Sequence, residues 1–216
     1  MGLLKTFPFQ QEQLYKWASG LALFTIIYNI GEGVASLYFG FEDGSLALFG
    51  FGADSFIEVL SGLGIAHMVL RIQRNPHSIK DDFERLALRI TGFSFYILVA
   101  GLVTTSIYNT WTNHNPRTTF AGIIVSVISI MVMWALIMLK TKVGKNLNSQ
   151  AILADAQCTK VCIYMSIVLL FSSGIYEILH IPYIDSLGSL GLSYFSFKEG
   201  RECFEKAKSN KDCCCK

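Results

Sequence analysis

Two acidic residues lie inside an apolar stretch of the chain. Asp54 and Glu58 fall within residues 45–70, which are otherwise long and apolar enough to cross a bilayer. Their spacing of four residues places both side chains on one face of a helix. An ionised carboxylate in hydrocarbon is costly, and two on one face repel each other unless a proton or a metal ion lies between them. This pattern indicates half of a metal-binding site.

A second pair with the same spacing occurs in the apolar stretch 151–175. Cys158 and Cys162 share one helical face, and Asp155 lies on nearly the same face. Two carboxylates and two thiolates suit a four-coordinate divalent metal such as Zn²⁺, and thiolates also favour soft ions such as Cd²⁺. Mg²⁺ and Ca²⁺ fit such a set poorly. The alternative is that the cysteines are small packing residues.

The depths of the two pairs can be compared at 1.5 Å per residue. Counted from the outer start of its segment, Asp54 is roughly 13 Å deep and Glu58 roughly 19 Å deep. Counted from the opposite side, Cys158 is roughly 12 Å deep and Cys162 roughly 18 Å deep. In a hydrocarbon core of about 30 Å the pairs meet near the midplane. Antiparallel helices would put Asp54 level with Cys162, and Glu58 level with Cys158.

The elements that position these residues are apolar segments. The chain has 216 residues, of which 52% are hydrophobic and only 16% charged, whereas soluble domains carry about a quarter charged residues. This composition predicts an all-α, multi-pass integral membrane protein with a six-transmembrane-helix bundle. The expected helices cover residues 21–39, 45–71, 90–108, 120–139, 151–175 and 183–197, the last extending as a polar helix to 206.

The basic residues predict the orientation of the bundle. Segments on one side of the expected membrane hold 16 of the 18 Lys and Arg, so both termini should be cytoplasmic, in a plasma or inner membrane. The expected division is a cytosolic N-terminal segment (1–20), a transmembrane domain (21–197), and a cytosolic helix extension with a Cys-rich tail (198–216). A net charge of +2 without a basic, aromatic-rich patch argues against nucleic acid as a partner.

Other polar residues allow more than one interpretation. Asn29 and Glu32 in the first segment could form interhelical hydrogen bonds, or Glu32 could be a third carboxylate near the site or a proton carrier. In the tail, Cys213, Cys214 and Cys215 could collect a soft metal, be palmitoylated, or belong to an unstructured end.

These motifs resemble the cation diffusion facilitators. Residues 45–58 are similar to the second helix of that family, and residues 154–162 are similar to its fifth helix. Asp185 also resembles a residue of that family. Glu58 stands in place of the usual Asp, and the two cysteines in place of His or Asp. The chain looks like a short form without the C-terminal cytosolic domain, similar to transmembrane protein 163-like and short bacterial cation-efflux proteins. The resemblance implies proton-coupled export of Zn²⁺ or a related metal by a homodimer with alternating access.

The resulting hypothesis is a divalent metal cation transporter. Expected metal ligands are Asp54, Glu58, Cys158, Cys162 and Asp155, with Asn29, Glu32 and Asp185 as accessory residues. The alternative is a membrane protein that binds metal as a sensor or regulator without transporting it. An enzyme with a cysteine nucleophile is not expected, because no histidine lies at a depth where it could activate the thiol.

Overall fold

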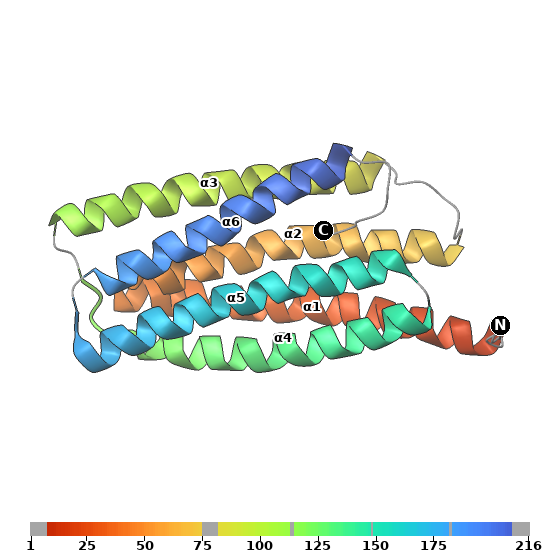
Figure 1. Ribbon diagram of the computed structural model, residues 1–216, viewed down its shortest axis with the longest axis horizontal. Coiled ribbons are helices and arrows are strands. Elements are labelled where there is room, and N and C mark those ends of the chain that lie inside the picture. The colour runs from red at the N-terminus through yellow and green to blue at the C-terminus, as the bar shows by residue number, and fades with distance from the viewer. Residues whose placement is uncertain (1–7, 75–81, 113–114, 148, 182, 209–216) are drawn as a thin grey trace.

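Six helices make up the fold in a computed structural model, which describes residues 8–74, 82–112, 115–147, 149–181 and 183–208 (Figure 1). No strand occurs in these ranges, so the prediction of an all-α bundle is confirmed. The helices are α1 (Pro8–Asp43), α2 (Leu46–Arg74), α3 (Asp82–Thr112), α4 (Phe120–Asn146), α5 (Gln150–Leu179) and α6 (Ile184–Lys208). Five of them, α1 to α5, are long and apolar enough to cross a membrane. In α6, serine and charged residues lower the hydropathy.

The helices extend beyond the apolar segments that predict them. α1 begins at Pro8, thirteen residues before the expected start, and runs unbroken through the polar residues that follow. Proline is tolerated in the first turn of a helix because its missing N–H would have no intrahelical partner there. α4 likewise continues past Leu139 to Asn146. Membrane hydropathy marks only the part of a helix that crosses hydrocarbon, so it misses these polar turns.

Successive helices run in opposite directions, so both ends of the described chain lie at one end of the bundle (Figure 1). We call the end that holds Pro8 and Lys208 the terminal end. Sequence neighbours α1 and α2 pack together, as do α4 and α5, while α3 packs mainly against α6. α2 also contacts α3, α5 and α6. Side chains of α2 can therefore meet side chains from four other helices.

The α1–α2 hairpin is closely packed. Gly44 turns the chain with a φ of 72°, a conformation that glycine adopts without steric cost. A Cβ atom added at Gly40 would lie 2.5 Å from the backbone nitrogen of Phe49. The two backbones can therefore approach this closely only because a side chain is absent.

At the end opposite the terminal end, α6 holds the start of α2. Asp185 is buried and accepts hydrogen bonds from Ser45 Oγ at 2.6 Å and from the backbone N–H of Leu46 at 2.7 Å. The first N–H groups of a helix lack intrahelical partners and favour a negative charge. Asp185 therefore caps α2 and fixes the helix that carries the two expected acidic ligands.

Candidate metal site

Glu58 is the point where three helices meet. Its Oε2 accepts a hydrogen bond from Asn29 Nδ2 of α1 at 2.9 Å. Its Oε1 accepts one from Cys162 Sγ of α5 at 2.7 Å. The carboxylate on α2 thus touches one of the two predicted sulfur ligands.

The register between α2 and α5 differs from the prediction by about one turn. The depth comparison paired Glu58 with Cys158 and Asp54 with Cys162, but the structure puts Glu58 against Cys162. The estimate was wrong because it assumed that both helices begin at the borders of a core of about 30 Å. With 29 and 30 residues, α2 and α5 are each about 44 Å long, so their starts lie farther apart.

Asp54 lies one turn farther from the terminal end. It is almost fully buried, and Ser196 Oγ of α6 donates to its Oδ1 at 3.4 Å. Ser196 also contacts Met165 Sδ of α5 at 4.0 Å. Asp54 therefore faces the same interior as Glu58 and is enclosed by α5 and α6.

The fourth predicted ligand cannot be placed. Cys158 lies within α5, but its side chain is outside the described residues. Among the described side chains, no three His, Cys, Asp or Glu residues are grouped so that they could hold a metal ion. The complete four-ligand shell therefore stays a prediction, of which the structure shows one contact between the two halves. Cys213 to Cys215 also lie outside the described residues.

A cavity of about 80 Å³ leads from Glu58 and Cys162 toward the terminal end. That volume corresponds to about two or three water molecules. Charged and polar side chains line its path: Lys140 on α4, Asp155 and Thr159 on α5, and Glu199, Cys203 and Lys206 on α6. The site therefore connects with the terminal end of the bundle.

Asp155 has a partner that the sequence analysis did not identify. Lys140 Nζ lies 3.0 Å from Asp155 Oδ2 and donates to Thr159 Oγ1 at 3.1 Å. The two charged side chains are only 3% and 11% exposed. Lys140 directly follows the expected helix 120–139, but α4 continues through it for about two more turns, and the lysine is buried. Asp155 was expected to be a ligand, but here it neutralises an ammonium group on the path to the site.

The polar residues of α1 form interhelical hydrogen bonds. Glu32 Oε2 accepts from Ser55 Oγ of α2 at 3.1 Å, and its Oε1 accepts from Tyr28 at 2.8 Å. Asn29 bonds to Glu58, while its own Oδ1 is buried and accepts no hydrogen bond from the described residues. The interhelical-bond interpretation is therefore confirmed for both residues, and the role of Glu32 as a proton carrier stays a prediction. Asp185, which was expected to be an accessory residue, caps α2 at Leu46, about 12 Å along the helix from Asp54.

Comparison with known proteins identifies the family to which this chain belongs. No curated protein matches this chain. The family model described as the cation efflux transmembrane domain matches residues 21–210, which include all six helices apart from the first turns of α1. The match spans the acidic motif of α2 and the cysteine motif of α5. The chain is thus an integral, multi-pass membrane protein and belongs to the cation efflux family of metal cation transporters.

Proposed function

We propose that this protein exports Zn²⁺, or a soft divalent ion such as Cd²⁺, from the cytosol in exchange for protons. The proposed ligands are Asp54 and Glu58 of α2 with Cys158 and Cys162 of α5. The observation that supports this most directly is the contact of 2.7 Å between Cys162 Sγ and Glu58 Oε1. It brings a thiol and a carboxylate from different helices together in a cavity inside the membrane-spanning bundle.

The donor atoms favour metals of the zinc type. Zn²⁺ accepts both sulfur and oxygen ligands in a tetrahedral shell, whereas Mg²⁺ and Ca²⁺ require oxygen ligands. The unpartnered Oδ1 of Asn29 supplies a further oxygen beside Glu58. A buried oxygen without a donor is costly unless something binds it. We therefore include Asn29 as an accessory residue of the site.

Proton exchange follows from the chemistry of the ligands. The hydrogen bond from the Cys162 thiol to Glu58 contains a proton that a metal bound to both atoms must displace. Metal binding to thiols and carboxylic acids releases protons, and protons arriving from the other side favour release of the metal. A proton gradient can therefore drive export once the site is alternately open to the two sides.

The proposed direction rests on the cavity and on the basic residues. The cavity leads toward the terminal end, which the Lys and Arg distribution predicts to be cytosolic. At the opposite end, polar contacts such as that of Asp185 with Ser45 tie α6 to α2. This arrangement fits a state that receives metal from the cytosol. As the family resemblance implies, we propose a homodimer as the working unit.

Flux measurements in proteoliposomes test the proposal. Purified protein is reconstituted with a Zn²⁺-sensitive dye inside, and a pH step is imposed across the membrane. We expect Zn²⁺ flux that depends on the step and is abolished in Asp54→Ala and Glu58→Gln. Glu205→Gln is the matched control, because this carboxylate is exposed on α6 and pairs with Arg201.

Two outcomes would contradict the proposal. Equal flux in Asp54→Ala and the parent protein would exclude the midplane site. Stoichiometric Zn²⁺ binding by the purified protein without any flux would instead support the sensor alternative.

A further inference from the structure

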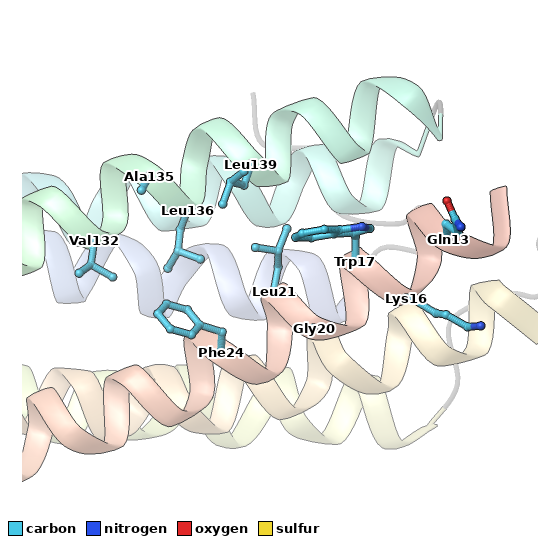
Figure 2. Close-up of a pocket in the computed structure, with 10 residues that line it drawn as sticks. All are labelled: Gln13, Lys16, Trp17, Gly20, Leu21, Phe24, Val132, Ala135, Leu136 and Leu139. Atoms are coloured by element: carbon cyan, nitrogen blue, oxygen red, sulfur yellow. The ribbon is translucent and has the colours of Figure 1, made fainter. Parts of the chain in front are cut away.

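A large apolar groove lies on the outside of the bundle, between α1 and α4. Its volume is about 790 Å³, within the range of about 300–1,000 Å³ typical of sites that hold small molecules. Figure 2 shows its lining, with α1 contributing one wall and α4 the other. It is separate from the cavity that reaches Glu58 and shares no lining residue with it.

The groove opens away from the other helices. Its floor is formed by Leu21 and Leu136, which are buried. Its sides carry Trp17, Phe24 and Leu139, whose side chains are 64%, 51% and 44% exposed. Whatever occupies the groove must therefore enter from the side of the bundle, which in a membrane protein faces lipid.

The groove leaves open space beside Gly20. A Cβ atom added at Gly20 would meet no atom within 4 Å. Gly20 lines the groove on the α1 side between Trp17 and Leu21. The space is thus not required for packing α1 against α4.

The groove reaches the level at which the apolar run of α4 ends. Leu139 is the last residue of the apolar run 120–139, after which α4 continues as a helix that carries three lysines up to Asn146. Toward the terminal end the lining becomes polar, with Gln13 and Lys16 beyond Trp17 (Figure 2). Tryptophan and lysine at this depth are typical of the level of the lipid headgroups.

We propose that this groove binds an anionic phospholipid from the leaflet at the terminal end. One acyl chain lies along Leu21 and Leu136, and the phosphate of the headgroup lies at the end that carries Gln13 and Lys16. An apolar channel with a cationic group only at the headgroup level complements such a lipid in both charge and depth. Two further exposed lysines, Lys142 and Lys145, extend the positive charge on α4 at this end.

Quenching of Trp17 fluorescence by brominated phospholipids tests the proposal in the full chain. Trp111 and Trp134 are exposed and are replaced by Phe, which leaves Trp17 as the single reporter. The protein is reconstituted in vesicles that contain either phosphatidylglycerol or phosphatidylcholine brominated on chain carbons near the headgroup. We expect half-maximal quenching at an about fivefold lower mole fraction of the anionic lipid, the factor that one lysine contributes at an anionic surface.

Two substitutions and their controls separate charge from shape. Lys16→Glu should remove the preference for the anionic lipid, whereas Lys198→Glu, an exposed lysine on α6, should keep it. Gly20→Leu should fill the groove and reduce quenching by both lipids. Gly31→Leu is its control, because a Cβ atom at this exposed position of α1 also meets no atom within 4 Å.

Three results would overturn the proposal. The first is equal quenching by anionic and zwitterionic lipid in the parent. The second is quenching in Gly20→Leu that matches that in Gly31→Leu. The third is the absence of quenching by either lipid, which would mean that protein, such as a second copy of the chain, covers the groove.

Discussion

Asn29 and Glu58 lie at nearly equal distances along the chain from the turn between α1 and α2, and their side chains meet at 2.9 Å. Lys140 and Asp155 likewise lie at nearly equal distances along the chain from the connection between α4 and α5, and their side chains form an ion pair. In an antiparallel helical hairpin with a short connection, residues equidistant from the turn lie at the same level. Each hairpin therefore brings a polar residue of one helix to an acidic residue of the other.

Replacing Asn29 should weaken metal binding without removing a proposed main ligand. In Asn29→Ala, Glu58 loses the donor that orients its Oε2, and partners of this kind contribute about 10–100-fold to metal affinity. Titration calorimetry with Zn²⁺ on purified protein measures the effect. Asn146→Ala, at the exposed end of α4, is the control and should bind like the parent. Unchanged affinity in Asn29→Ala would mean that Glu58 needs no such support.

Replacing Cys162 should change the selectivity for metals. A serine keeps the size of the side chain but offers an oxygen, which soft ions bind less well than sulfur. We expect Cys162→Ser to reduce the affinity for Cd²⁺ more than the affinity for Zn²⁺ when the two ions compete for purified protein. Elemental analysis after dialysis against an equimolar mixture gives the ratio. Cys203→Ser, farther along the cavity on α6, is the comparison, and an equal shift in both variants would argue against Cys162 as a ligand.

Breaking the pair of Lys140 and Asp155 should destabilise the protein more than removing it. Lys140→Met or Asp155→Leu alone leaves a buried charge without its partner, at a cost of about 3–5 kcal/mol. The double variant removes both charges and should recover most of the loss. Thermal unfolding in detergent measures the three proteins. The exposed pair of Arg201 and Glu205 on α6 provides the control, since breaking it should have little effect.

Removing the cap on α2 should loosen the end of that helix. Asp185→Ala leaves Ser45 and the backbone N–H of Leu46 without their acceptor, and the loss of a cap costs about 0.5–2 kcal/mol. Asp185→Asn keeps an acceptor oxygen and should lose less. Hydrogen exchange of residues 46–49 reports the opening directly. Equal protection in Asp185→Ala and the parent would contradict the capping role.

Adding one methyl group should be harmful at Gly52, where α2 packs against α1, and harmless at Gly31, on the exposed face of α1. A Cβ atom at Gly52 would lie 2.7 Å from the backbone nitrogen of Leu37 and 2.9 Å from Ser36 Cβ, and overpacking costs about 1–3 kcal/mol. Gly31→Ala meets nothing and should stabilise the helix by about 0.5–1 kcal/mol. Thermal unfolding compares the two. A similar melting temperature would show that the hairpin can separate without loss.

The sequence predicts the helices and the contacts within hairpins better than those between hairpins. Long apolar segments mark α1 to α5, because hydrocarbon demands such runs. A shorter apolar run that continues as a polar helix marks α6. The level at which Glu58 meets Cys162 could not be read in the same way, since two helices separate α2 from α5 in the chain and tilt and length set their register. The burial of Lys140 escaped prediction because a lysine after an apolar run is typical of a membrane border.

The close packing of α1 against α2 determines which parts of the molecule can move independently. With no room for a side chain at Gly40 or Gly52, α1 and α2 pack closely, and we expect them to move together as one rigid unit. In the proposed transport cycle, we expect opening toward the other side to move this unit past α5 and to separate Glu58 from Cys162, while Asn29 stays with Glu58. A covalent tether between α1 and α2 would leave such a cycle running, whereas a tether between α2 and α5 would arrest it.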